Sequence, residues 1–167
     1  GKAPVYAYAV DTGTVAGGVT QCNVNLTTGM LGNCSLAISG GFSRPRQIAV
    51  YNGFVYVGNA TGTLMQCAIG ENGISSCSDA VSGLSESSSI AFSNGFAYIG
   101  TFNDGVQVIQ QCNVASPSGT VSNCTEVKRF SDNATYAGMA VNNGFLYVAI
   151  LDDGVSQVSK ATINPTT

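Results

Sequence analysis

Short apolar runs, each bounded by turn residues, organise this chain of 167 residues. Within each run, β-branched and aromatic residues alternate with small or polar ones, which is typical of β-strands. Three times, two such runs flank an Asn-Gly pair, whose preference for positive φ angles suits a type I′ turn. The sequence therefore predicts β-hairpins at 48–57, 90–99 and 139–148.

Two further runs complete the repeat. The third run ends in Gln-Cys in three units, and the fourth run follows a glycine-containing turn and carries a second cysteine. A short hairpin brings the two cysteines of one unit within bonding range. We therefore predict three disulfides within units, Cys22–Cys34, Cys67–Cys77 and Cys112–Cys124.

A metal site is the competing explanation of six cysteines. It is disfavoured because the chain has no C-x-x-C pair and no histidine. Disulfides indicate an oxidising compartment, so we expect a secreted, extracellular or cell-surface protein.

Repeats of about 45 residues with four short strands are typical of a β-propeller. We predict an all-β fold of about four four-stranded antiparallel blades, the first strand of each unit innermost, in one domain spanning 1–167. The expected units are approximately 1–47, 48–89, 90–138 and 139–167. The terminal blades are incomplete in this prediction, because the first unit begins at its second strand and the last stops at its third.

The last unit differs from the others at one informative position. Ala161 aligns with Cys22, Cys67 and Cys112, so the unit without a fourth strand also lacks the cysteine that would need a partner there. This favours a natural end over a cut through a longer array, and simple divergence of the last unit is the alternative.

Composition narrows the classes of partner. Only 9% of residues are charged, against roughly a quarter in an average soluble domain. Six Lys and Arg and a net charge of -3 argue against nucleic-acid binding, which needs clustered basic residues. The apolar runs are too short to span a bilayer, so we expect no membrane insertion.

One repeat resembles the YVTN-type (lactonase-like) propeller repeat family of bacteria and archaea. The resemblance lies in Pro45-Arg46-Gln47-Ile48-Ala49-Val50, the turn Asn52-Gly53 and the run Tyr56-Val57-Gly58-Asn59. It implies a secreted or surface-layer protein with many blades, and it carries no catalytic residue over to this chain. The cysteine pair departs from that family's pattern.

Catalytic chemistry is limited in this composition. Without histidine, and with the cysteines assigned to disulfides, no Ser-His or Cys-His nucleophile is available, so we expect no enzyme and no cofactor. Asp104 and Asp152-Asp153 fall between the second and third strands of their units, as does Asp11. Turn formation explains these residues, and a Ca²⁺ site at Asp104, Asp152 and Asp153 is the alternative.

Loops that connect one unit to the next should share a face with these turns. They bring mixed polar and aromatic residues towards the axis, the kind of lining that a carbohydrate site uses, with ordinary solvated loops as the alternative. The candidate ligand face consists of Arg44, Arg46, Glu86, Asp104, Asp132, Tyr136 and Asp152.

Five Asn-x-Ser/Thr sequons are candidate N-glycosylation sites in a glycosylating source. They are Asn25, Asn33, Asn59, Asn123 and Asn133.

Two functions remain open from the sequence. The first is a non-enzymatic extracellular structural module that assembles with copies of itself, head to tail, into a filament, ring or surface lattice. The second is a carbohydrate-binding, lectin-like propeller that binds glycans.

Overall fold

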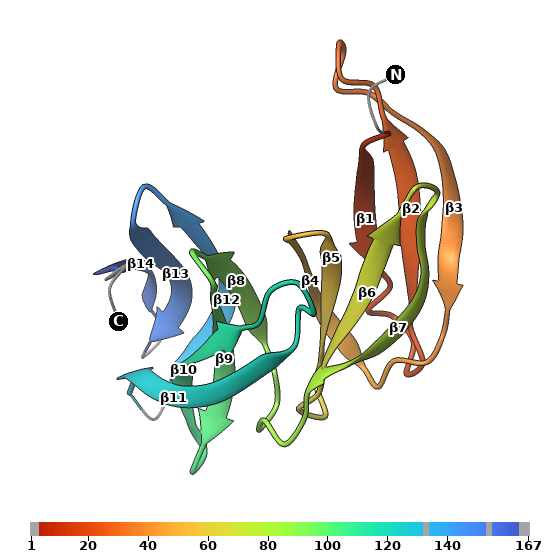
Figure 1. Ribbon diagram of the computed structural model, residues 1–167. Coiled ribbons are helices and arrows are strands. Elements are labelled where there is room, and N and C mark those ends of the chain that lie inside the picture. Colours follow the sequence, from red (N-terminus) through yellow and green to blue (C-terminus); the bar gives the residue numbers. More distant parts are fainter. Residues whose placement is uncertain (1–3, 132–133, 153–154, 164–167) are drawn as a thin grey trace.

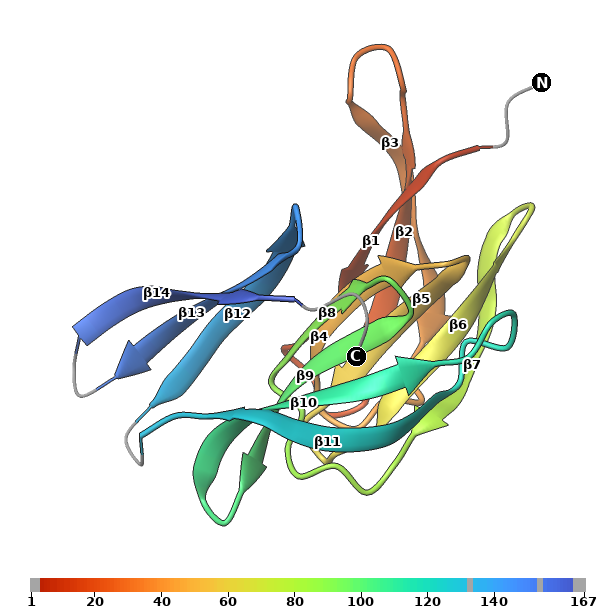
Figure 2. The same ribbon diagram turned by 60° about the vertical axis from the view of Figure 1, so that its left-hand side comes forward.

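The computed structural model describes residues 4–131, 134–152 and 155–163. Fourteen strands in these residues form four antiparallel sheets that follow one another along the chain. The sheets fan out in an arc, with the first and fourth at opposite ends (Figure 1, Figure 2). The all-β prediction is confirmed, and the described residues contain no helix that could cross a membrane.

Each sheet has its strands in chain order. The two middle sheets have four strands each, namely β4 (Pro45–Tyr51), β5 (Phe54–Asn59), β6 (Leu64–Gly70) and β7 (Gly73–Val81), then β8 (Ser89–Ser93), β9 (Phe96–Asn103), β10 (Val106–Val114) and β11 (Val121–Arg129). The outer sheets have three each, namely β1 (Tyr6–Val10), β2 (Gly18–Val24) and β3 (Leu31–Ser39), then β12 (Thr135–Asn142), β13 (Phe145–Asp152) and β14 (Val155–Thr162). Within the described residues, the first sheet therefore lacks a counterpart of β4, and the fourth lacks a counterpart of β7.

The Asn-Gly turns have the backbone that the sequence predicts. Both residues of each pair have positive φ, as a type I′ turn requires. The values are 45° and 80° at Asn52-Gly53, 51° and 83° at Asn94-Gly95, and 48° and 77° at Asn143-Gly144. Two of the sheets begin a few residues before the predicted units, at Pro45 and Thr135, because a shift in register near the start of each strand lets the pairing extend further.

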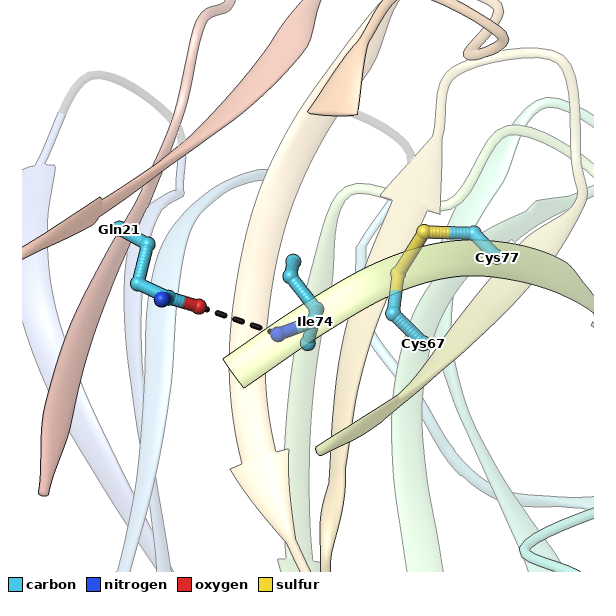
Figure 3. Close-up of a disulfide and its surroundings, with 4 residues drawn as sticks. All are labelled: Gln21, Cys67, Ile74 and Cys77. Carbon is cyan, nitrogen blue, oxygen red and sulfur yellow. Dashed lines mark hydrogen bonds between the residues drawn. A yellow bond between two sulfur atoms is a disulfide. The ribbon is translucent and has the colours of Figure 1, made fainter. Parts of the chain in front are cut away.

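Three disulfides join the last two strands of each of the first three sheets, with the pairing that the spacing predicts. The Cα atoms of the bonded cysteines lie 4.0, 4.1 and 4.1 Å apart. Cys67 and Cys77 are direct partners across β6 and β7 (Figure 3). Three disulfides are consistent with an extracellular location.

The core lies between the sheets, which pack face to face. Each pair of neighbouring sheets encloses one apolar cluster, and the clusters are centred on Val19, Val55 and Ile74, on Tyr56, Ile99 and Val121, and on Tyr98, Ile109 and Leu146. Strand β8 contacts both β4 and β12, so the first strands of these three sheets adjoin along the inner side of the arc. This agrees with the expectation that the first strand of each unit is innermost.

A glutamine joins the first sheet to the second. The side-chain amide of Gln21 donates a hydrogen bond of 3.1 Å to the Asn72 carbonyl. Its side-chain oxygen accepts one of the same length from the Ile74 N–H (Figure 3). Gly73 lies between these two residues at φ +89°, and a Cβ atom there would come within 1.9 Å of the Gln21 oxygen. Only glycine allows this close approach.

Candidate functional site

Loops and turns from different sheets meet on one face of the molecule, at the lower side in Figure 1. The β3–β4 loop holds the turn after β5, because the Ala60 N–H donates to the Arg44 carbonyl at 2.9 Å. The β7–β8 loop is joined to β9 in the same way, from the Phe102 N–H to the Ser85 carbonyl at 3.0 Å. The connecting loops and these turns therefore share a face.

An open cavity of about 880 Å³ lies among these loops. Four of the seven residues of the candidate ligand face line it together, namely Arg44, Arg46, Glu86 and Asp104. All four side chains are exposed, and none makes an ion pair or side-chain hydrogen bond within the described part of the chain. Two guanidinium groups and two carboxylates are thus free to bind a ligand. We call this cavity the charged cleft.

Three of the four charged residues have left-handed backbone. Asp104, at φ 53°, forms a two-residue turn with Gly105 at φ 78°, which is the turn chemistry expected of Asp-Gly. Arg44 and Glu86, at φ 51° and 39°, have no such local reason, and this conformation costs about 1 kcal/mol or more for a residue with a Cβ atom. A contact between loops holds Arg44, since its N–H donates to the Val15 carbonyl at 2.8 Å.

Sequence reasoning did not include the apolar part of the cleft. Leu84 and Phe102, both half-buried, line the cavity beside the charged side chains. Their positions, just before Ser85-Glu86 and Asn103-Asp104, were the available signal.

The structure does not describe the side chains of the remaining predicted face and metal residues. Asp132 and Asp153 lie outside the described residues, as do the side chains of Tyr136 and Asp152. Among the described residues, no group of three His, Cys, Asp or Glu is placed to hold a metal ion. Asp11 is used in a local turn, where its carboxylate accepts a hydrogen bond from the Gly13 N–H at 2.8 Å.

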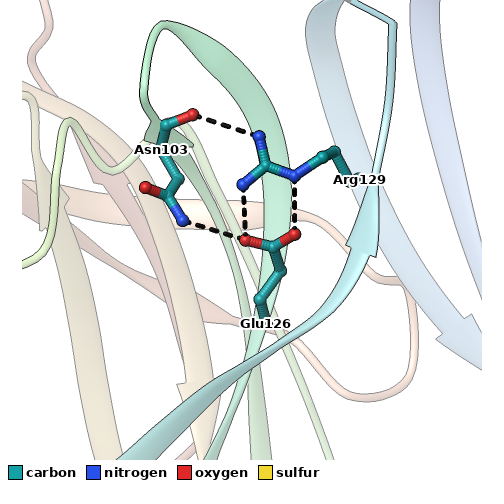
Figure 4. Close-up of polar contacts among 3 residues, drawn as sticks. All are labelled: Asn103, Glu126 and Arg129. Atoms are coloured by element: carbon teal, nitrogen blue, oxygen red, sulfur yellow. Dashed lines mark hydrogen bonds and ion pairs between the residues drawn. The ribbon is translucent and has the colours of Figure 1, made fainter.

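A polar network supports the turn that carries Asp104. Arg129 forms two hydrogen bonds with the Glu126 carboxylate, 2.8 and 2.9 Å long, and the Asn103 amide donates to the same carboxylate at 2.9 Å (Figure 4). These hydrogen bonds, from Arg129 and then Asn103, hold the pKa of Glu126 below its usual value. Glu126 and Arg129 are three positions apart on β11, so strict alternation would place their side chains on opposite faces of the sheet. The pairing of β11 with β10 has a register shift between Glu126 and Lys128, which interrupts that alternation.

The sequons divide into accessible and inaccessible sites. Asn25, Asn33 and Asn123 are exposed, and Asn133 lies outside the described residues. Asn59 corrects the sequence prediction: it is only 2% exposed, and its side-chain oxygen accepts a hydrogen bond from the Ser43 N–H. A glycan at Asn59 is incompatible with this packing.

Comparison with known proteins supports the repeat architecture. The LVIVD repeat model matches residues 85–125, which include β8, β9 and β10. A comparison with curated proteins finds no match.

Solved structures show what the fold is similar to. The chain aligns with the computationally designed Ika4 protein at a TM-score of 0.55 and 17% identity, over 98% of this chain and 88% of that one. It aligns with a chain of the Nidogen/Laminin complex at 0.60 and 12% identity, over 95% and 75%. It also aligns with the PQQ-bound aldose sugar dehydrogenase of Streptomyces coelicolor at 0.53 and 14% identity, over 96% and 62%. Together with the repeat match, this likeness supports a disulfide-containing repeat protein of β-propeller-like fold.

Proposed function

We propose that this chain is a non-enzymatic extracellular structural module that assembles with copies of itself, head to tail. The observation that carries the proposal is the unequal completion of the four sheets. Within the part of the chain that the structure describes, the first sheet has no inner strand and the fourth has no outer strand of the kind that both middle sheets have. Strands β1 and β14 therefore present backbone N–H and C=O groups that no strand pairs within the described residues, and such edges recruit further strands.

Few charges protect these two edges. Strand β1 reads Tyr-Ala-Tyr-Ala-Val and has no charged residue, and β14 has only Lys160. Because the two edges differ, a contact between them is heterologous, and it produces a ring if the rotation closes and a filament if it does not.

Residue chemistry supports a non-enzymatic role. The sequence has no histidine, and all six cysteines are bonded to one another. The carboxylates that remain in the charged cleft can bind a ligand without performing catalysis.

Light scattering on the purified full chain tests the assembly. We expect a mass above the 17.0 kDa of one chain that grows with concentration, and rings, filaments or a lattice in electron micrographs. A monodisperse monomer at high concentration would show that the edges do not recruit copies and would overturn the proposal.

Carbohydrate binding is the second candidate, and the charged cleft favours it. Its guanidinium and carboxylate groups can bind sugar hydroxyls, and the half-buried Phe102 and Leu84 offer apolar surface to a sugar ring. Binding to a glycan array that Arg46→Ala and Glu86→Ala abolish, while Glu71→Ala in the β6–β7 turn does not, would support it. An array with no signal at millimolar glycan would exclude it.

A further inference from the structure

A second cavity adjoins the charged cleft at the junction of the second and third sheets. It has a volume of about 360 Å³ and is lined by residues of β7, the β7–β8 loop, β9, β10 and β11. Leu84, Ser85 and Phe102 line both cavities. The two cavities therefore form one groove, which begins in the charged cleft and continues past these residues towards the outer strands. We call the second cavity the amide pocket.

Hydrogen bonds between loops hold the middle of the groove in place. The Leu84 N–H donates to the Gly62 carbonyl, and the Phe102 N–H donates to the Ser85 carbonyl, each at 3.0 Å. A Cβ atom at Gly62 would overlap the Leu84 carbonyl, so only glycine allows the first of these contacts. Two half-buried apolar side chains are thus fixed between the polar ends of the groove. A site that is formed in advance loses less conformational entropy when a ligand binds.

Side-chain amides supply the polar groups of the amide pocket. They belong to Asn103, Gln110 and Asn123. The Asn103 amide donates to the Glu126 carboxylate, which fixes that side chain (Figure 4). Gln110 is half-buried and Asn123 is exposed, and within the described residues neither side chain makes a hydrogen bond. An amide group both donates and accepts hydrogen bonds, so these free amides suit the hydroxyl groups of a sugar.

The charged cleft at the other end selects for an acid group. Arg44 and Arg46 have no ion pair within the described residues, and a guanidinium binds a planar carboxylate through two parallel hydrogen bonds. Glu86 and Asp104 balance their charge, and carboxylates accept hydrogen bonds from hydroxyl groups. A ligand with one carboxylate and several hydroxyls on a unit fits this combination. A dense polyanion fits it less well, because the two carboxylates of the cleft repel it.

We propose that the groove binds a linear polysaccharide that contains uronic acid residues. One uronate lies in the charged cleft with its carboxylate on the guanidinium groups, and the next ring packs on Phe102 and Leu84. A further ring reaches Gln110 and Asn123 in the amide pocket. This inference rests on carbohydrate binding, the second candidate function, and names the class of glycan. The free edges of β1 and β14 take no part in it.

Calorimetric titration tests the ligand class, with hexasaccharides of polygalacturonate, alginate and hyaluronan as probes. Because Asn123 belongs to a sequon, the chain is produced in a host without N-glycosylation. We expect at least one hexasaccharide to bind with a Kd below about 1 mM. Methyl esterification of its carboxyl groups should weaken binding about tenfold, because the charge-assisted hydrogen bonds are lost.

Charge variants locate the acid group. Arg46→Gln should weaken binding of the same hexasaccharide about tenfold. Lys128→Gln is the matched control, since it removes one positive charge from exposed β11 outside the groove and should bind normally. Esterified chains that bind as tightly as the acid would overturn the inference and leave carbohydrate binding standing. No binding of any saccharide, including the neutral ones of the glycan array, would reject both.

Chain length and two neighbouring glutamines test whether both cavities take part. The hexasaccharide should bind about tenfold more tightly than its monosaccharide, because only the longer ligand reaches the amide pocket. Gln110→Ala should remove most of this gain without changing monosaccharide binding. Gln111→Ala is the matched control, since Gln111 lies on the opposite face of β10 and its amide donates to the Tyr98 hydroxyl at 3.2 Å. Equal affinity of Gln110→Ala and the native chain for the hexasaccharide would confine binding to the charged cleft and overturn the groove.

Discussion

Single glycines set how closely neighbouring sheets approach. Gly73 and Gly119 have positive φ at the tips of hairpins, and each lies where a side chain would collide with the preceding sheet. The glutamine and tyrosine that bind these turns reach backbone atoms only because no Cβ atom intervenes. The repeat therefore depends on the residue at the turn as much as on the apolar strands.

Gly119→Ala should be much more destabilising than Gly29→Ala. Both residues have nearly the same φ, so both changes carry the cost of left-handed alanine, about 1 kcal/mol. Only Gly119 adds a collision with Phe54 and Tyr56, and overpacking costs about 1–3 kcal/mol. Urea unfolding of dilute protein measures both variants. Equal losses of stability would mean that the collision with Phe54 and Tyr56 is relieved at no cost in free energy.

Tyr56 connects the second and third sheets through one buried hydroxyl. Burial, with a smaller effect of nearby Tyr51, raises the pKa of Tyr56 to about 12, and the hydroxyl donates to the Gly119 carbonyl. Since burial disfavours the phenolate, the folded chain retains this proton at a pH where the unfolded chain has lost it.

Stability should therefore fall as pH rises from about 10 to about 12. Below pH 10, Tyr56 is protonated in both states and contributes no pH dependence. Above it, the contribution of Tyr56 declines by up to about 1.4 kcal/mol per pH unit. Urea unfolding at pH 9, 10 and 11 measures the slope, and Tyr56→Phe should reduce it. An unchanged slope in that variant would assign the pH dependence to other groups.

Each disulfide stabilises the pair of strands at the outer side of its sheet. The last strand of each of these sheets packs against neighbouring sheets only in part, as the exposed positions of β3, β7 and β11 show. A covalent bond between them restricts the unfolded chain and prevents the outer strand from separating from its sheet.

Replacing both Cys67 and Cys77 by serine should destabilise the chain by about 3 kcal/mol. The estimate comes from the loop entropy of a bond between residues 10 positions apart. Cys67 lies in the core between the first and second sheets and Cys77 packs against it, whereas Cys34 is exposed, so the cost should exceed that for Cys22 and Cys34, which close a comparable loop. Thermal unfolding monitored by circular dichroism compares the two double variants. Equal losses would assign the whole effect to loop entropy.

Much of this organisation could be predicted from local patterns. Asn52-Gly53 specifies a turn by its own backbone preference, and the short distance between Cys67 and Cys77 specifies a bond within one hairpin. The different contacts of the repeated glutamines could not be predicted, because Gln21, Gln66 and Gln111 look alike in sequence and differ only in what lies opposite them. Burial of Asn59 was missed for a similar reason, since its partner Ser43 belongs to a loop distant in the chain.

At the scale of the molecule, the arc separates two kinds of surface. The charged cleft lies on the face formed by the connecting loops, between the second and third sheets. The free edges and the projecting β2–β3 hairpin lie at the ends of the arc and beyond it (Figure 2). Assembly through the ends therefore leaves the cleft open to solvent.

Purified protein should hydrolyse no ester, lactone or glycoside. Glu86 and Asp104 are the carboxylates that share the cleft, and a carboxylate pair is a hydrolytic arrangement that needs neither histidine nor thiol. Such a pair works in a site that excludes water, whereas both side chains here are exposed to solvent beside two guanidinium groups. Chromogenic and fluorogenic substrates of each class measure turnover against a Glu86→Gln, Asp104→Asn double variant as the blank. A rate in the native chain that the double variant lacks would make the cleft an active site and overturn the non-enzymatic proposal.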